Sequence, residues 1–168
     1  MTTYIGIDPG PTYTGFCVIK NGKLVYSTTF KREDKEIPIF WWANHVADQI
    51  ENIVAQFPGA KIGVEGVVTP QAYFAGKKNL MNPKHLIFTG VIAGTIAGRF
   101  HKAVIVRPGK NGSGANYPPE LTGTRPKDLP GKAVGTRNHE RSAYDVANQI
   151  ELHLKEEYQY DRQMGMFD

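Results

Sequence analysis

The chain of 168 residues contains one cysteine, Cys17, which excludes an internal disulfide and a zinc site made of several cysteines. No apolar run is long enough to span a bilayer, because the longest, LIFTGVIAGTIAG, is short and interrupted by glycines. The first residues, MTTYIG, carry no basic segment, so we expect no secretory signal. These absences favour a reduced, cytoplasmic setting and no membrane partner.

The composition is that of an ordinary globular protein, with 40% hydrophobic and 21% charged residues. This length is sufficient for one domain with a hydrophobic core. The net charge of +4 and the pI of about 9.1 suit a polyanionic partner, although many basic proteins bind no nucleic acid.

The hydrophobic pattern predicts an α/β fold with the element order β-β-β-α-β-α-β-α. The expected strands are 4–7, 14–20, 24–30, 61–67 and 103–106, and the expected helices are 38–56, 82–98 and 139–158. Asn21-Gly22 predicts a two-residue hairpin turn, because both positions tolerate positive φ. We therefore expect a mixed five-stranded sheet with helices on both faces, in a single domain over 1–158 with a flexible tail over 159–168.

Two acids lie near the C-terminal ends of otherwise apolar expected strands: Asp8 in IGIDPG and Glu65 in IGVEGV. If these strands are neighbours, the two carboxylates converge and require a positive charge to neutralise them. Hard divalent cations prefer such oxygen ligands. The alternatives are that Asp8 caps the Asp-Pro-Gly turn and that Glu65 points into solvent.

A third candidate element is the start of the last helix, in RNHERSAYDVANQ. His139, Ser142 and Asp145 are spaced by three residues, so they lie along one stripe of that helix. His139 and Asp145 are candidates for further metal ligands or a general base. Taken alone, the stretch favours an ordinary polar helix start, with Asn138 as the cap and Glu140 complementing the helix dipole.

Four stretches occur in an order that resembles the RuvC-type Holliday junction resolvases, members of the RNase H-like nuclease superfamily. They are IGIDPGPTYTG, VEGV, LIFTGVIAGTIAG and HERSA. The chain length and the HERSAYDVA segment are more similar to phage-encoded members. The resemblance implies an RNase H-like fold and a crossover junction endodeoxyribonuclease, acting in a bacterial or phage-infected cytoplasm. It would nick a four-way DNA junction in pairs as a homodimer, using Mg²⁺ or Mn²⁺ with two ions.

The resemblance also implies roles for single residues. Asp8 matches the first-strand aspartate, Glu65 the fourth-strand glutamate, and His139 the first position of the last-helix motif. Ser142 departs from the family, which usually has Asp there, and Asp145 lies one turn further on as a substitute. The expected catalytic and metal-binding set is therefore Asp8, Glu65, His139 and Asp145.

Two basic segments are candidates for contacts with DNA. In QAYFAGKKN, Tyr73 or Phe74 would stack on an unpaired base while Lys77 and Lys78 meet phosphates. The stretch 107–137 lacks periodicity and precedes the last helix. Its candidate phosphate-binding residues are Arg107, Lys110, Arg125, Lys127, Lys132 and Arg137. The alternatives are an aromatic ring in the core and lysines or loops that are only solvated.

Three further features indicate partner surfaces. Gly90, Gly94 and Gly98 recur every four residues, which favours tight helix packing, on the sheet or between subunits. Trp41 and Trp42 are adjacent, so they cannot face the same way and one is available for an interface. The tail segment QMGMF resembles the motif by which bacterial proteins bind the DNA sliding clamp. Its anchors would be Gln163, Met164, Met166 and Phe167, and the alternative is an inert tail.

Two rival functions remain open on the sequence. A DNA-binding module that keeps the fold but cleaves weakly or not at all would explain Ser142. An actin-like phosphotransferase would also place an Asp at a strand end, but the chain is short for that two-lobed architecture and no second phosphate loop is evident.

Overall fold

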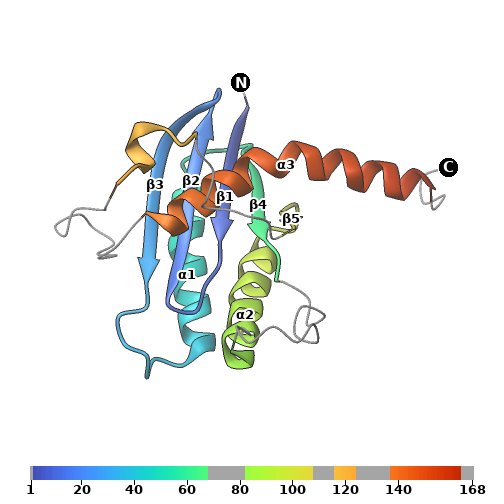
Figure 1. The fold of residues 1–168 in the computed structure, drawn as a ribbon. Helices are drawn as coiled ribbons and strands as arrows, with labels where there is room; N and C mark the ends of the chain where they lie inside the picture. The colour runs from blue at the N-terminus through green and yellow to red at the C-terminus, as the bar shows by residue number, and fades with distance from the viewer. Residues whose placement is uncertain (1, 68–81, 108–115, 124–136, 164–168) are drawn as a thin grey trace, which may run out of the picture.

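The structure is a computed structural model that describes residues 2–67, 82–107, 116–123 and 137–163, with only the backbone described over 157–163. Its core is one five-stranded sheet with the strand order β3-β2-β1-β4-β5 (Figure 1). The strands are β1 (Thr3–Asp8), β2 (Tyr13–Lys20), β3 (Lys23–Lys31), β4 (Lys61–Glu65) and β5 (Val104–Val106). The helices are α1 (Ile39–Val54), α2 (Pro83–Arg99) and α3 (Asn138–Gln163).

The predicted α/β class and mixed sheet are confirmed. The first three strands form an antiparallel meander, whereas β4 runs parallel to β1, and β5 runs parallel to β4. The predicted turn at Asn21 and Gly22 has φ angles of 52° and 76°, so both residues adopt the left-handed conformation that type I′ hairpins need.

Some boundaries differ from the prediction. β4 ends at Glu65 rather than at Val67, which makes Glu65 the last residue of its strand. A short 3-10 helix, η2 (Pro119–Leu121), lies within the stretch predicted to be without regular structure. Helix α3 continues to Gln163, so its last turn extends into the segment predicted to be a tail.

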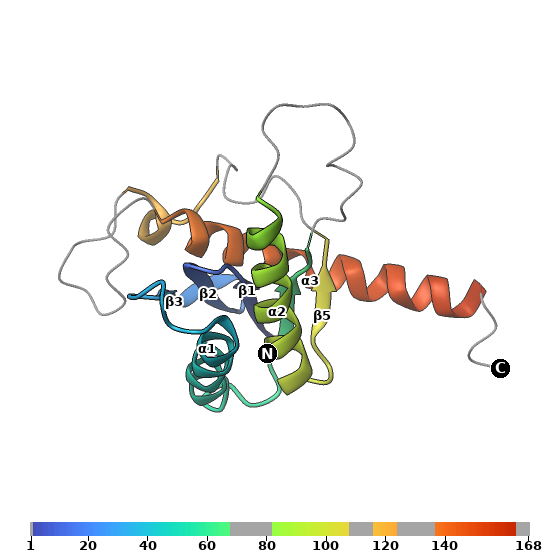
Figure 2. The same cartoon turned by 90° about the horizontal axis from the view of Figure 1, so that it is seen from below.

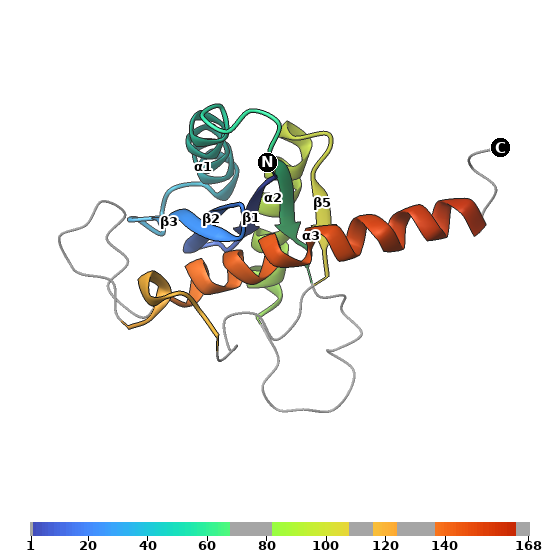
Figure 3. The same ribbon diagram turned by 90° about the horizontal axis from the view of Figure 1, so that it is seen from above.

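The two faces of the sheet carry different helices, as seen from both ends of the molecule (Figures 2 and 3). In β1 the side chains alternate, so Ile5 and Ile7 join the core under α1 and α2. Gly6 faces the other way, where a Cβ would overlap the backbone of α3 at Ala143. Helix α3 therefore lies directly on β1 and β2, and its C-terminal half projects beyond the edge of the sheet near β5.

Helix α1 separates its two tryptophans as the sequence predicts. Trp42 is 4% exposed and packs in the core, whereas Trp41 is 56% exposed and stacks on the His45 ring. Among the described residues, no helix has both the length and the apolar character needed to cross a membrane.

Candidate active site

Two acids lie close to each other at the carboxyl ends of two strands, because these strands are parallel neighbours. Asp8 is the last residue of β1, and Glu65 is the last residue of β4. The two strands pair with Ile7 opposite Val64, so both strands end on the same side of the sheet. The sequence left open whether these strands are neighbours, and the structure shows that they are.

A cleft of about 650 Å³ opens at this edge, and Asp8, Glu65 and His139 all line it. These three side chains come from β1, β4 and α3, which are far apart in the sequence. The rest of the wall comes from the β1–β2 turn, the loop after β3, the end of β4 and the first turns of α2: Pro9, Gly10, Pro11, Thr12, Tyr13, Lys35, Gly66, Val67, His85, Leu86 and Thr89.

The His139 ring is oriented from two sides. Its Nδ1 lies 3.0 Å from Oδ2 of Asp8, within hydrogen-bond and ion-pair distance. The Tyr13 ring stacks against it with centroids 5.3 Å apart and planes 28° apart. The Asp8 side chain is 14% exposed and the His139 side chain 40% exposed, so the pair is open to the cleft yet held in place.

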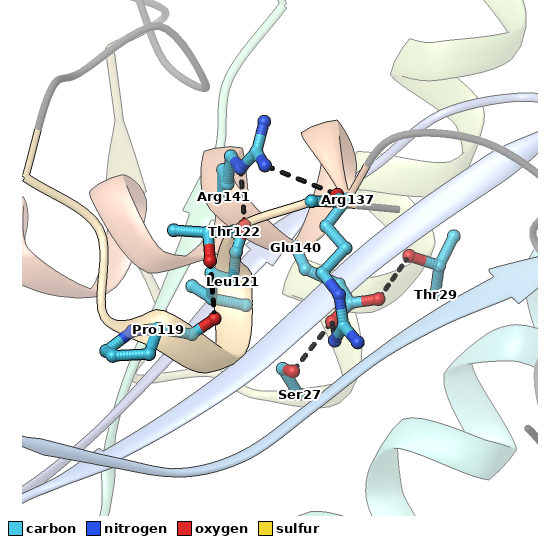
Figure 4. Close-up of polar contacts among 9 residues, drawn as sticks. Ser27, Thr29, Pro119, Leu121, Thr122, Arg137, Glu140 and Arg141 are labelled. Carbon is cyan, nitrogen blue, oxygen red and sulfur yellow. Dashed lines mark hydrogen bonds and ion pairs between the residues drawn. The ribbon is translucent and has the colours of Figure 1, made fainter. Parts of the chain in front are cut away.

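The start of α3 is fixed by a buried carboxylate next to His139. Glu140 is fully buried, and its two oxygens accept hydrogen bonds from the hydroxyls of Ser27 at 2.6 Å and Thr29 at 3.4 Å (Figure 4). Both hydroxyls come from β3. The guanidinium of Arg137 lies 3.6 Å from the same carboxylate. A buried charge is tolerated only when it is paired in this way, so Glu140 ties the first turn of α3 to the sheet.

A glycine in β2 permits this close approach. A Cβ on Gly15 would overlap the carbonyl oxygen of His139, so only glycine lets the helix start lie against the strand. Sequence reasoning missed this anchoring and assigned Glu140 only a dipole role. The available signal was the pair of hydroxyl residues in β3, Ser27 and Thr29. They are two residues apart, so both side chains lie on the face of the sheet that α3 covers.

Asp145 does not line the cleft. The hydroxyl of Tyr117 donates a hydrogen bond to its Oδ2, and Tyr117 belongs to the segment 116–123 that packs beside α3. Arg141 holds the same segment, because its Nε donates to the carbonyl oxygen of Leu121 at 2.6 Å (Figure 4). The structure therefore brings together three of the four predicted site residues and places the fourth in a different contact. Ser142 is half-buried on α3.

Two of the predicted DNA-binding residues lie in the described part of the chain. Arg107 is exposed just after β5, and its backbone N–H donates to Nε2 of His153. Arg137 is only 17% exposed and pairs with Glu140. Tyr73, Phe74, Lys77, Lys78, Lys110, Arg125, Lys127 and Lys132 lie outside the described residues. So do Met164, Met166 and Phe167, and the side chain of Gln163 is likewise not described.

Two basic residues of the cleft were not predicted from the sequence. Lys35 comes from the loop after β3, and His85 from the first turn of α2. Lys35 stands in a run of charged residues that is typical of any solvated loop. His85 directly follows the Asn82-Pro83 helix start, and neither pattern indicates a site by itself.

The side chains in the cleft suit a hard divalent cation, although they do not form a closed cage. Within the described residues, no group of three or more His, Cys, Asp and Glu side chains is close enough to hold a metal by itself. Mg²⁺ commonly takes one or two carboxylates and completes its shell with water and substrate phosphates. Asp8 and Glu65 provide two carboxylates, which fit Mg²⁺ or Mn²⁺, and the His139 imidazole lies beside Asp8.

No protein-family model and no curated protein sequence matches the chain. Its fold does match solved structures. A structure of RuvC from Thermus thermophilus is 16% identical with a TM-score of 0.54, over 98% of this chain and 97% of that one. T. thermophilus RuvC in complex with a Holliday junction substrate is 17% identical with a TM-score of 0.50, over 64% of this chain and 66% of that one. The chain therefore has a RuvC-like, RNase H-like α/β fold.

Proposed function

We propose that this protein is a metal-dependent, structure-selective endodeoxyribonuclease that resolves four-way DNA junctions by paired phosphodiester nicks. The observation that carries the proposal is the cleft where Asp8, Glu65 and His139 meet, at the shared end of two parallel strands. This cleft lies in a fold shared with RuvC, of which one structure contains a Holliday junction substrate.

The chain's own residues have distinct roles in this proposal. Asp8 and Glu65 would hold Mg²⁺ or Mn²⁺, in one or two sites, and the bound ion would supply stabilisation of the charge that develops on the phosphate. His139 would orient the attacking water and take up its proton. Its fixed contact with Asp8 and its stacking on Tyr13 keep the ring directed at the cleft.

Paired nicks require two active sites, so the proposal includes a homodimer. Helix α2 offers a surface for it, because a Cβ at Gly94 or at Gly98 would meet nothing within 4 Å among the described residues. Ile87 on the same helix is 65% exposed. Close approach of a second copy over small residues suits this face. Binding of the tail to a sliding clamp, and the cytoplasmic setting, stay predictions from the sequence.

The first test is cleavage of a labelled four-way junction with Mg²⁺ or Mn²⁺ by wild type, Asp8→Asn and Asp145→Asn. We expect paired nicks by wild type, and loss of cleavage with retained junction binding by Asp8→Asn, because the phosphate contacts come from other residues. Asp145→Asn should keep cleavage if Asp145 acts only through Tyr117, and should lose it if Asp145 reaches the metal when DNA binds. Cleavage by Asp8→Asn at the wild-type rate would overturn the assignment of the cleft.

A second candidate function is a junction-binding module with weak or no cleavage. Ser142 favours it, since the related resolvases usually have Asp there and only two carboxylates line the cleft among the described residues. Junction binding without nicks in either metal would support this candidate. Restoration of cleavage by Ser142→Asp would then identify the missing ligand.

A further inference from the structure

A second hollow adjoins the catalytic cleft. It has a volume of about 380 Å³ and lies between the loop after β3 and the start of α2. Pro11, Thr12, Lys35 and His85 line both this hollow, here called the side groove, and the cleft that contains Asp8 and Glu65. The two spaces therefore form one continuous track. Figure 1 shows the loop after β3 and the first turn of α2 at the same end of the molecule as the end of β1.

One wall of the side groove is held in a fixed shape by Arg32. This residue is 8% exposed, and its guanidinium donates to the carbonyl oxygens of Pro11, Lys35 and Ile37. A guanidinium presents several donors in a rigid fork, so a single side chain ties the loop after β3 to the β1–β2 turn. The Asp34 side chain also accepts from the backbone N–H of Glu36 at 2.9 Å. Lys35 thus projects from a wall that is organised before any ligand binds.

The opposite wall is the first turn of α2. The Asn82 side chain caps the helix by accepting from the backbone N–H of Lys84 at 2.9 Å. The Lys84 ammonium lies over the Phe88 ring, 5.3 Å from its centroid, and Phe88 lines the groove. This wall therefore combines a cation with an apolar ring, and His85 continues it into the cleft.

The charges that line the side groove favour an anion. Lys35 and Lys84 stand on opposite walls, with His85 between the groove and the cleft, and Glu36 is the one carboxylate among the residues that line it. Phosphate is attracted to ammonium groups, and the partly buried Phe88 ring adds an apolar surface beside Lys84. A polymer with repeating phosphates fits a track that leads out of a nuclease cleft better than a single small anion does.

We propose that the side groove binds the phosphate backbone of the DNA strand on one side of the phosphate that is cut, through Lys35 and Lys84. This inference rests on the proposed function and adds to it the path of the strand. Basic residues outside the described part of the chain would contact other parts of the DNA.

The first experiment measures the salt dependence of junction binding without divalent cations, so that no cleavage occurs. The variants are Lys35→Ala with Lys84→Ala, and the matched control Lys20→Ala with Lys23→Ala. Lys20 and Lys23 are exposed at the β2–β3 turn, and Lys20 pairs with Thr3, at the opposite end of β1 from Asp8.

Loss of two phosphate contacts should reduce the slope of log K against log salt concentration by about 1.4–1.8. The affinities of wild type and the groove variant should therefore converge as salt is raised, whereas the control variant should follow wild type. Lys35→Arg with Lys84→Arg should restore the slope, because arginine keeps the charge. A groove variant with the slope of the control would overturn the inference.

The second experiment uses the burial of the only cysteine. Cys17 is fully buried and burial raises the pKa of its thiol, so it should react slowly with maleimide. A Lys84→Cys variant then carries one accessible thiol in the groove, and Lys23→Cys carries one at the distant turn. Junction DNA should protect the thiol at 84 and leave the thiol at 23 reactive. Equal reactivity at 84 with and without bound DNA would contradict the inference.

The design separates failure of the inference from failure of the proposed function. If wild type binds and cuts the junction but the groove variants behave as their controls, only the path of the strand is wrong. If wild type neither binds nor cuts any junction, the proposed function fails and the side groove loses its ligand with it. Thermal unfolding of each variant confirms that the fold is retained.

Discussion

Glu140 should be the polar residue on which the position of α3 depends most strongly. Its side chain is fully buried between α3 and β3 and is paired with two hydroxyls and one guanidinium. The perturbation is Glu140→Ala, which removes the carboxylate and leaves Ser27, Thr29 and Arg137 without it.

The expected loss in the free energy of unfolding depends on the buried groups that lose their partner. Removal of one partner of a buried ion pair costs about 3–5 kcal/mol. The side chain of Arg137 is 17% exposed and 3.6 Å from Glu140, so it can turn partly towards water and the loss should be near 3 kcal/mol. A domain of this size loses roughly 2–4 °C in Tm for each kcal/mol, which gives a decrease of about 6–12 °C.

The assay is urea and thermal unfolding followed by circular dichroism, for a series of variants. Glu140→Gln keeps the shape, and its single amide oxygen can accept from one of the two hydroxyls while its NH2 donates to the other, so it should lose about half as much as Glu140→Ala, near 1–2 kcal/mol. Ser27→Ala removes the 2.6 Å donor and should cost about 1–3 kcal/mol. Glu156→Ala, at an exposed site on the same helix, should stay within about 0.5 kcal/mol of wild type.

A Glu140→Ala variant as stable as Glu156→Ala would contradict this role of the buried carboxylate. A second readout concerns the site. Because His139 precedes Glu140, a loosened helix start should lower kcat for the proposed junction cleavage more than it weakens junction binding. A variant that loses stability but keeps the full kcat would show that Glu140 acts on the fold and not on the position of His139.

Two further predictions concern other contacts of the sheet. Gly15→Ala would force a Cβ into the carbonyl oxygen of His139, and we expect a loss of at least 1–3 kcal/mol in urea unfolding, roughly the cost of overpacking; unchanged stability would contradict the close approach. Glu151 has a pKa lowered from the ordinary value of 4.5, first by its hydrogen bond with Lys61 and next by that with Tyr4. Its contribution is therefore present above pH 4.5 and lost as the pH falls through the lower folded value, so Glu151→Gln and wild type should differ at neutral pH and converge in acid.

Local rules on the sequence predict much of the fold. The alternation of Ile5 and Ile7 with Gly6 predicts a strand, and Asn21-Gly22 predicts the turn that closes the first hairpin. Helix spacing predicts α1 and α2 to within a few residues. Periodicity is less informative at the ends of elements. For this reason the predicted helix ended at Tyr158, whereas α3 continues to Gln163.

The candidate site was predicted in part, for a physical reason. Asp8 and Glu65 each interrupt an apolar segment, and an acid at the end of a buried strand can be recognised from the sequence alone. His139 depended on the resemblance to RuvC-type resolvases, because a polar residue in the first turn of a helix is ordinary by itself. Helical spacing predicted that Asp145 lies on the same stripe of the helix as His139. The structure instead gives it a hydrogen bond from Tyr117, in a segment whose position cannot be predicted from periodicity.

By itself, the sequence determined which segments become strands and helices, because side-chain period and turn chemistry are local properties. It also determined that carboxylates would stand at the ends of β1 and β4. The tertiary structure makes β1 and β4 neighbours, brings the Glu140 carboxylate within hydrogen-bond distance of the hydroxyls of β3, and places Lys35 and Lys84 in the lining of one groove. Those relations join residues distant in the chain: strand pairing creates the first, and the packing of α3 and α2 on opposite faces of one sheet creates the other two.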